Sequence, residues 1–328
     1  MTGPPVHRRP GWPERVAIWE VGPRDGLQNE PTVVPAAVKA ELITRLVAAG
    51  LRTVEATSFV NPTWVPQLAD AEEVMRLLGP APGTGSLAAG GGPPGSGDGV
   101  RYPVLVPNLA GLDRALACGV RDVAVFASAT ETFARRNLNR GRQQALDGFV
   151  PVVATAKAAG LGVRGYLSMC FGDPWEGDVP PDQVVGVAGQ LLAMGCDDLS
   201  LGDTIGVATT GQVVDLLDRL AAAGAGPGRL AVHFHDTYGQ ALANSLAAVE
   251  WGVTTVDASA GGLGGCPFAG SATGNLATED LCWALAGLGV DTGVDLDALV
   301  ATSRWLADRL GRPSPSRVVQ ALSAMEGR

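Results

Sequence analysis

The sequence predicts an α/β fold, a (β/α)8 barrel with a C-terminal helical extension. From Arg15 onward, short β-rich runs alternate with helical runs that end in glycine. The alternation occurs eight times, and eight βα units close most simply into a barrel. The chain of 328 residues is long enough, because such barrels need roughly 250 residues. An open doubly wound sheet is the alternative, but the turn 22–26 after the first strand lacks the GxGxxG phosphate fingerprint.

The expected elements follow from local composition and periodicity. The eight strands are rich in β-branched and apolar residues and are expected at 16–20, 53–56, 103–106, 123–126, 163–167, 198–201, 230–235 and 255–259. Helices are expected at 36–49, 65–78 and 109–117, within 130–159 with an irregular start at 135–137, and at 296–310. Gly50 ends the first of these helices, as is typical of a helix C-terminus.

Three regions are expected along the chain. Residues 1–14 form a flexible N-terminal tail, residues 15–290 form the barrel, and residues 291–328 form the helical extension. The stretch 79–99 is rich in Gly, Pro and Ser and buries too little apolar surface to offset its ordering entropy. We interpret it as a surface insertion, because the alternation of strands and helices resumes after it.

Composition limits the classes of function. Hydrophobic residues make up 46% and charged residues 17%, which predicts a soluble globular protein with a sizeable core. The net charge of −9 and the lack of a basic stripe argue against nucleic-acid and anionic-membrane partners. No apolar leader and no run of eighteen apolar residues occurs, and the five cysteines are scattered without a CxxC pair. We therefore expect free thiols and a cytoplasmic location.

Two of the three histidines, His233 and His235, lie one residue apart on an expected strand. Because side chains alternate along a strand, both imidazoles point to the same face. Two imidazoles on one face can bind a metal ion together. The alternative is a pair of core histidines, each held by hydrogen bonds.

Other polar side chains favour the metal. In a (β/α)8 barrel the active site lies at the carboxyl ends of the strands. The residues expected at this rim are Glu20, Arg24, Asp25, Glu55, Asp203, Thr204, His233, His235 and Asp236. Asp25 with the two histidines would bind Mg²⁺, Mn²⁺ or Zn²⁺ and leave positions open for substrate. Alternatively, Asp25 is a turn residue and Arg24 forms a surface salt bridge.

A glycine-rich loop, 261–268, carries a single thiol, Cys266. Four glycines in five residues allow the loop to swing over a bound ligand, and the thiol could then act as nucleophile, acid or base. The alternative is a small buried hydrophobic residue. That alternative is our interpretation of the other cysteines, Cys118, Cys170, Cys196 and Cys282.

Four segments resemble one enzyme family, the 3-hydroxy-3-methylglutaryl-CoA (HMG-CoA) lyases. These segments are Gly22–Glu30, Ser200–Gly206, His233–Gln240 and Gly262–Pro267, and the resemblance extends from Val16 to Leu310 with an interruption at 79–99. Leu27 stands where the related isopropylmalate and homocitrate synthases typically have Glu. The family resemblance also implies a (β/α)8 barrel.

The resemblance implies a function and a set of site residues. The reaction is the retro-aldol cleavage of HMG-CoA, an acyl-CoA, to acetyl-CoA and acetoacetate, as in leucine degradation and ketone-body formation. Mg²⁺ or Mn²⁺ would be bound by Asp25, His233, His235 and Asn275. His233 or Asp25 would act as the base.

The remaining implied roles concern substrate and product. Arg24 would polarise substrate oxygens and stabilise the enolate, Glu55 would lie near the reacting centre, and Cys266 would deliver a proton. The resemblance also implies a homodimer. Substrate-binding roles are expected for Arg24, Ser58, Ser200, Asp203 and Thr204.

Three alternative functions stay open. The same chemistry could act on a longer branched 3-hydroxyglutaryl-CoA, since the sequence does not reveal the pocket around the C3 substituent. A Claisen-type acyl-CoA condensing synthase is disfavoured by Leu27 and by the missing long regulatory domain. A non-catalytic ligand-binding barrel is disfavoured because every candidate ligand, Arg24 and Cys266 are present.

Overall fold

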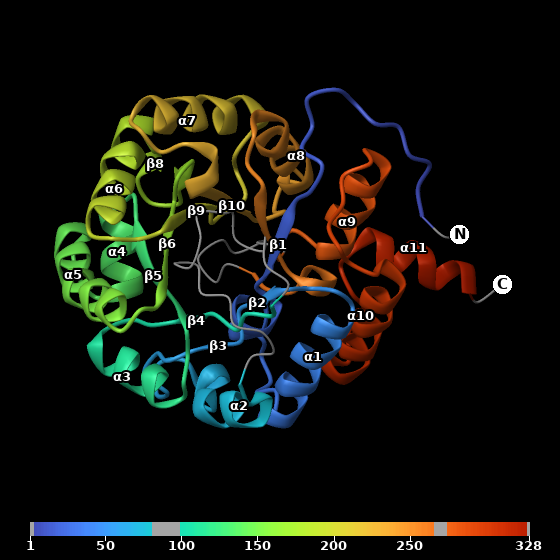
Figure 1. Ribbon diagram of the computed structural model, residues 1–328, viewed down its shortest axis with the longest axis horizontal. Coiled ribbons are helices and arrows are strands. Elements are labelled where there is room, and N and C mark those ends of the chain that lie inside the picture. The colour runs from blue at the N-terminus through green and yellow to red at the C-terminus, as the bar shows by residue number, and fades with distance from the viewer. Residues whose placement is uncertain (1–2, 81–98, 266–273, 327–328) are drawn as a thin grey trace.

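The computed structural model describes residues 3–80, 99–265 and 274–326, and it has the predicted (β/α)8 architecture (Figure 1). The parallel sheet runs in the order β2-β1-β11-β10-β9-β6-β5-β4-β3. The strands are β1 Ala17–Glu20, β2 Thr53–Val54, β3 Thr57–Ser58, β4 Val104–Leu105, β5 Asp122–Ser128, β6 Gly162–Ser168, β9 Asp198–Asp203, β10 Leu230–Phe234 and β11 Thr255–Ala258.

The sheet closes because β2 and β3 are two halves of one barrel strand. Glu55 and Ala56 separate them, and their N–H groups bond in opposite directions around the barrel. Glu55 donates to the carbonyl of Glu20 at 2.8 Å, and Ala56 donates to that of Pro103 at 2.9 Å. All eight predicted strands are therefore confirmed, and the open doubly wound alternative is wrong.

Helices surround the barrel and cover its outer face (Figure 1). They are α1 Ala36–Ala48, α2 Ala71–Leu78, α3 Leu109–Ala117, α4 Glu131–Leu138, α5 Arg142–Ala158, α6 Pro181–Ala193, α7 Thr210–Ala222, α8 Ala241–Trp251, α9 Thr278–Gly287, α10 Leu296–Leu310 and α11 Arg317–Glu326. The expected helices at 109–117 and 296–310 match α3 and α10. The last two helices confirm the helical C-terminus.

Three local features differ from the expected pattern. The stretch expected to be helical within 130–159 is two helices, divided at Asn139, which adopts a left-handed conformation with φ 54°. The expected helix at 65–78 begins instead with a 3-10 turn, Pro66–Leu68, ahead of α2. A short antiparallel hairpin, Gly172–Asp173 with Gly177–Asp178, follows β6.

The barrel has a conventional apolar layer outside its strands but a charged interior. Arg101 pairs with Asp122 at 3.0 Å. Arg164 pairs with Asp198 at 2.8 Å and with Asp257 at 2.7 Å. Trp19 lies against both arginines, with its ring centroid 3.6 Å from the Arg164 guanidinium carbon and 5.4 Å from that of Arg101. Buried charges of this kind persist only when they are paired and hydrogen-bonded.

The first described residues of the chain and the last helix, α11, both lie against α9. The N–H group of His7 donates to the carbonyl of Gly287, at the end of α9, at 2.8 Å. Most of the predicted insertion, residues 81–98, lies outside the described residues. None of the helices in the described part of the chain is long and apolar enough to cross a membrane.

Candidate active site

A cavity of about 790 Å³ opens at the carboxyl ends of the barrel strands. The end nearest the barrel axis is polar and contains Arg24, Asp25, His233 and His235. Apolar and polar side chains both line the remainder, and they include Phe126, Phe133 and Phe149 together with Asn61, Asn137 and Arg140. The cavity therefore combines a charged centre with a wall of mixed apolar and polar character.

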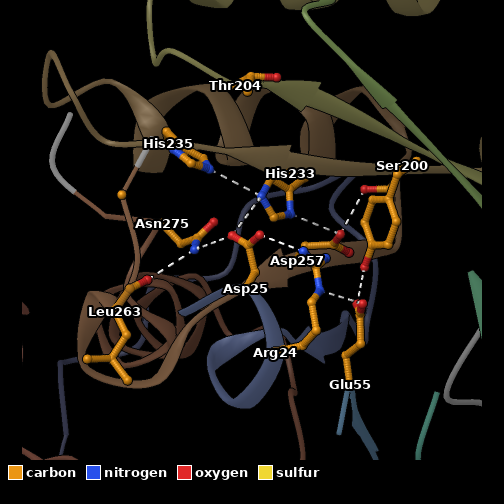
Figure 2. Close-up of polar contacts among 12 residues, drawn as sticks. Arg24, Asp25, Glu55, Ser200, Thr204, His233, His235, Asp257, Leu263 and Asn275 are labelled. Carbon is orange, nitrogen blue, oxygen red and sulfur yellow. Dashed lines mark hydrogen bonds and ion pairs between the residues drawn. The ribbon is translucent and has the colours of Figure 1, made fainter. Parts of the chain in front are cut away.

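Three potential metal ligands converge at the polar end. Asp25 lies on a π-helical turn, Gly22–Gly26, directly after β1, and this turn was not expected from the sequence. His233 lies on β10, and His235 follows it. One ligand atom from each of the three lies within 4.8 Å of the others. The two Nε2 atoms are 3.4 Å apart, and Asp25 Oδ2 lies 3.8 Å from His233 Nε2 (Figure 2).

Asn275 supplies an oxygen beside these groups. Its Nδ2 donates to Asp25 Oδ2 at 2.8 Å and to the carbonyl of Leu263 at 3.0 Å (Figure 2). Its Oδ1 is buried and has no hydrogen-bond partner among the described residues. A buried acceptor without a partner is costly. One carboxylate, two imidazoles and this free oxygen fit a divalent cation that accepts mixed oxygen and nitrogen ligands.

The protonation states suit metal binding. Burial raises the pKa of Asp25, but the charges of Arg24 and the two histidines outweigh it and hold this pKa well below its usual range. Burial and the neighbouring His233 lower the pKa of His235 to about 4, so His235 is neutral at pH 7. Burial also lowers the pKa of His233, but the hydrogen bond to Asp257 and the charge of Asp25 raise it above its usual value. Asp25 and His235 therefore offer unprotonated ligand atoms at neutral pH.

Arg24 is held rigidly at the edge of this group. Its Nε donates to Glu55 Oε1 at 2.7 Å, and its Nη1 donates to Asp25 Oδ1 at 2.6 Å. Glu55 is fully buried, and its Oε2 also accepts from Trp19 at 3.2 Å and from the Tyr166 hydroxyl. Tyr166 in turn lies under the guanidinium, with 5.3 Å between its ring centroid and the guanidinium carbon. Glu55 therefore orients Arg24 and Tyr166, which both reach the cavity.

A family model described as HMGL-like matches residues 15–306. The chain belongs to the HMGL-like family.

Individual HMGL-like proteins resemble nearly the whole length of the chain. The mitochondrial hydroxymethylglutaryl-CoA lyase of Arabidopsis thaliana is 49% identical over 313 residues, which cover 95% of this chain and 63% of that protein. The hydroxymethylglutaryl-CoA lyase structure from Pseudomonas aeruginosa superposes with a TM-score of 0.88 at 45% identity and covers 96% of this chain and 99% of that one. An HMG-CoA lyase from Acinetobacter baumannii, in complex with coenzyme A and 3-methylmalate, gives a TM-score of 0.85 at 35% identity, covering 96% and 97%.

The other predicted site residues of this HMGL-like protein lie at different depths. Ser200 and Thr204 line the cavity. Ser58 and Asp203 are buried and are not part of its wall as the described residues form it. The Asp203 carboxylate instead accepts the N–H groups of Val207 and Ala208 at 3.0 and 2.9 Å and shapes the turn after β9. Cys266 lies outside the described residues.

Three interior residues of this HMGL-like barrel were not expected from the sequence. Tyr166 lines the cavity and touches Glu55. Asp257 lies beside His233, and Arg164 lies behind Asp257. For Asp257 and Arg164 the available signal was a charged residue in the middle of a β-rich run, because such a residue needs a partner when it is buried in the barrel.

Two buried carboxylates hold the short turn Ala260–Gly262, which precedes the glycine-rich stretch of sequence that carries Cys266. Glu20 accepts the N–H groups of Gly22 and Ala260, each at 2.8 Å, and the Thr278 hydroxyl at 2.6 Å. Glu279 accepts the Gly261 N–H at 2.9 Å and also bonds the Ser303 hydroxyl. Burial raises the pKa of Glu20 to about 7 and that of Glu279 to about 8.

We expect Glu20→Gln to change how stability depends on pH. The folded pKa of Glu20, about 7, lies above its ordinary value of 4.5, so its stabilising contribution is complete below pH 4.5 and is lost as the pH rises through 7. Glutamine cannot ionise and keeps an oxygen that accepts from Gly22 and Ala260. The free energy of unfolding of the wild type should therefore fall relative to that of the variant, by up to roughly 3 kcal/mol, between about pH 5 and pH 8.

Urea unfolding at several pH values checks this expectation. Glu41→Gln is the control, because Glu41 forms an exposed ion pair with Arg45 on α1. Unfolding free energies that run parallel for the wild type and Glu20→Gln across this pH range would contradict the assigned pKa.

Proposed function

We propose that the protein is a divalent-metal-dependent carbon–carbon lyase that cleaves (S)-3-hydroxy-3-methylglutaryl-CoA to acetyl-CoA and acetoacetate. The observation that supports this most directly is the convergence of one carboxylate, two imidazoles and a buried arginine in the wall of the cavity. The HMG-CoA lyases among its relatives support the same substrate. The mixed apolar and polar wall suits a pantetheine arm, which is a long, mostly uncharged chain that carries two amide groups.

Asp25, His233, His235 and Asn275 are the residues that would hold the metal. Mg²⁺ or Mn²⁺ suits two oxygen ligands with two imidazoles, and no cysteine among the described residues adjoins the site to favour a softer ion. When bound, the ion supplies Lewis acidity that lowers the pKa of the substrate's C3 hydroxyl.

The base that removes the hydroxyl proton is His233 or Asp25, and the ligand set favours Asp25. A metal-bound His233 would have no nitrogen free to accept a proton, because Nδ1 lies 3.3 Å from the Asp257 carboxylate and Nε2 is the atom that would hold the ion. The Asp25 carboxylate has two oxygens, so one could hold the ion while the other accepts the proton. Its depressed pKa makes Asp25 a weak base, but the bound ion would also lower the pKa of the C3 hydroxyl. Proton transfer to Asp25 would leave an alkoxide whose collapse breaks the C2–C3 bond.

Arg24 and Cys266 would handle the second product. Cleavage leaves acetoacetate and the enolate of acetyl-CoA, whose negative charge lies on the thioester oxygen. Arg24 is oriented before substrate arrives, so its guanidinium could stabilise this charge without reorganisation. The Cys266 thiol would then protonate the terminal carbon. Ser200 and Thr204 would bond the substrate, whereas Ser58, Glu55 and Asp203 would act by orienting neighbouring groups.

Acetoacetate release from HMG-CoA tests this function. We expect release with Mg²⁺ or Mn²⁺, loss of release with EDTA, and a fall of about 100- to 10,000-fold in kcat for Cys266→Ala if the thiol is the general acid. Cys118→Ala is the matched control, because Cys118 is a half-buried thiol at the end of α3. If the wild-type protein released no acetoacetate with metal present, the proposal that HMG-CoA is the substrate would be wrong.

The same assay distinguishes the remaining alternatives. Activity on a 3-hydroxyglutaryl-CoA with a longer C3 branch, but not on HMG-CoA, would change the substrate and keep the chemistry. Condensation of acetyl-CoA with a 2-oxo acid would instead indicate a synthase. The cytoplasmic location, the homodimer and the role in leucine degradation stay predictions.

A further inference from the structure

A buried carboxylate lies directly beside one of the two histidines. Asp257 of β11 pairs in register with His233 of β10, and its Oδ2 lies 3.3 Å from His233 Nδ1 (Figure 2). The same Oδ2 accepts the Ser200 hydroxyl at 2.8 Å, and Oδ1 accepts Arg164 Nη1 at 2.7 Å. Asp257 is therefore surrounded by donors, and its side chain is completely shielded from solvent.

These contacts determine which nitrogen of His233 carries the proton. An ionised carboxylate can only accept hydrogen bonds, so His233 Nδ1 must be the donor. In a neutral imidazole the other nitrogen is then an acceptor. Nε2 is that nitrogen, and it faces Asp25 Oδ2 at 3.8 Å and His235 Nε2 at 3.4 Å.

Arg164 in turn holds Asp257. Its guanidinium is fully buried, stacks on Trp19, and bridges Asp257 to Asp198, which bonds Arg164 Nε at 2.8 Å. A planar fork between two carboxylates restricts where each carboxylate can lie. His235 has no equivalent support, because its Nδ1 has no hydrogen-bond partner in the described part of the chain.

We propose that Asp257, oriented by Arg164, is a positioning residue that holds His233 as the Nδ1–H tautomer and presents its Nε2 lone pair to the metal site. Carboxylates that bond a ligand histidine in this way commonly orient the ring and strengthen metal binding. The importance of this arrangement for catalysis rests on the proposed function, but the tautomer and the metal affinity can both be measured without substrate. Failure of the proposed substrate would leave these two results unchanged.

The first test is the tautomer of His233 in the metal-free protein. The chain has only three histidines, so ¹⁵N-histidine labelling gives three imidazole patterns, and the loss of one in His233→Gln assigns the ring. At about pH 8.5 we expect His233 to carry its proton on Nδ1 and none on Nε2. A proton on Nε2 in the wild type would overturn the proposal without the need for any variant.

The second test uses Asp257→Asn, whose amide is nearly isosteric and can donate to Nδ1. We expect the proton to move to Nε2 and the Kd for Mn²⁺ to rise about 10- to 100-fold. Asp122→Asn is the matched control, because it neutralises a carboxylate of another buried arginine pair in the same barrel. A wild-type tautomer and Mn²⁺ affinity in Asp257→Asn would reject the proposal. Equal changes in both variants would also reject it, since the effect would then be a general loss of barrel structure.

Discussion

Arg24→Lys is expected to lower kcat for HMG-CoA cleavage by about 100- to 1,000-fold, the usual cost of losing an oriented donor to a developing oxyanion. The guanidinium bonds Glu55 and Asp25 through different nitrogens and stacks on Tyr166. A lysine ammonium is a compact charge without this planar fork. The ammonium cannot bond the carboxylates of Glu55 and Asp25 and also donate to the enolate oxygen in the same geometry. Steady-state kinetics with saturating Mn²⁺ measures the effect.

The control for this prediction is Arg45→Lys. Arg45 also bonds a carboxylate, that of Glu41, and stacks on an aromatic ring, that of Trp305. It lies on α1, however, and is not part of the cavity wall. We expect its kcat to stay within about twofold of the wild type, because surface pairs contribute little. If Arg24→Lys also stayed within tenfold of the wild-type kcat, the proposed role of Arg24 at the enolate would be wrong.

Asp25→Asn is expected to weaken Mn²⁺ binding by at least about 100-fold. Loss of a residue that only supports a ligand lowers metal affinity by up to about this factor, and Asp25 would itself be a ligand. The substitution keeps the shape of the side chain and removes its charge. Since the pKa of Asp25 is strongly depressed, the wild-type carboxylate stays ionised across the ordinary pH range, so a loss of Mn²⁺ affinity as the pH falls to 5 would come from protonation of His233, whose pKa is raised. Direct titration of Mn²⁺, followed by electron paramagnetic resonance, measures the change.

Asp236→Asn serves as the comparison. Asp236 follows His235 directly, but its carboxylate accepts the N–H of Ala241 at 3.0 Å at the start of α8 and is not part of the ligand group. Its Mn²⁺ affinity should therefore remain within about threefold of the wild type. Wild-type affinity in Asp25→Asn would show that the metal is held elsewhere.

Much of the fold and part of the site could be predicted from local sequence. The strands and most helices were predictable because the period of their apolar residues reflects burial on one face. His233 and His235 were predictable as a pair because strand geometry alone places them on one face. Asp25 could be placed at the carboxyl end of β1, although its π-helical turn could not be foreseen from the Asp-Gly pair.

The partners of the supporting residues could not be predicted, because they depend on contacts between strands that are distant in the sequence. Asp257 meets His233 through the register of β10 and β11, and Arg164 reaches Asp257 across the interior of the barrel. Neither contact leaves a pattern within either segment. Likewise, Glu55 was expected near the reacting centre, but its hydrogen bonds to Trp19, Arg24 and Tyr166 involve three separate strands or turns.

The charged interior of the barrel also affects how the chain folds. A shift of β6 by one residue would turn Arg164 from the interior toward the helices, because successive side chains on a strand point to opposite faces. Asp198 and Asp257 would then be buried without their cation, at a cost of several kcal/mol for each ion. Apolar side chains in these positions would tolerate such a shift more easily. The ion pairs that surround the active site thus also disfavour misaligned barrels during folding.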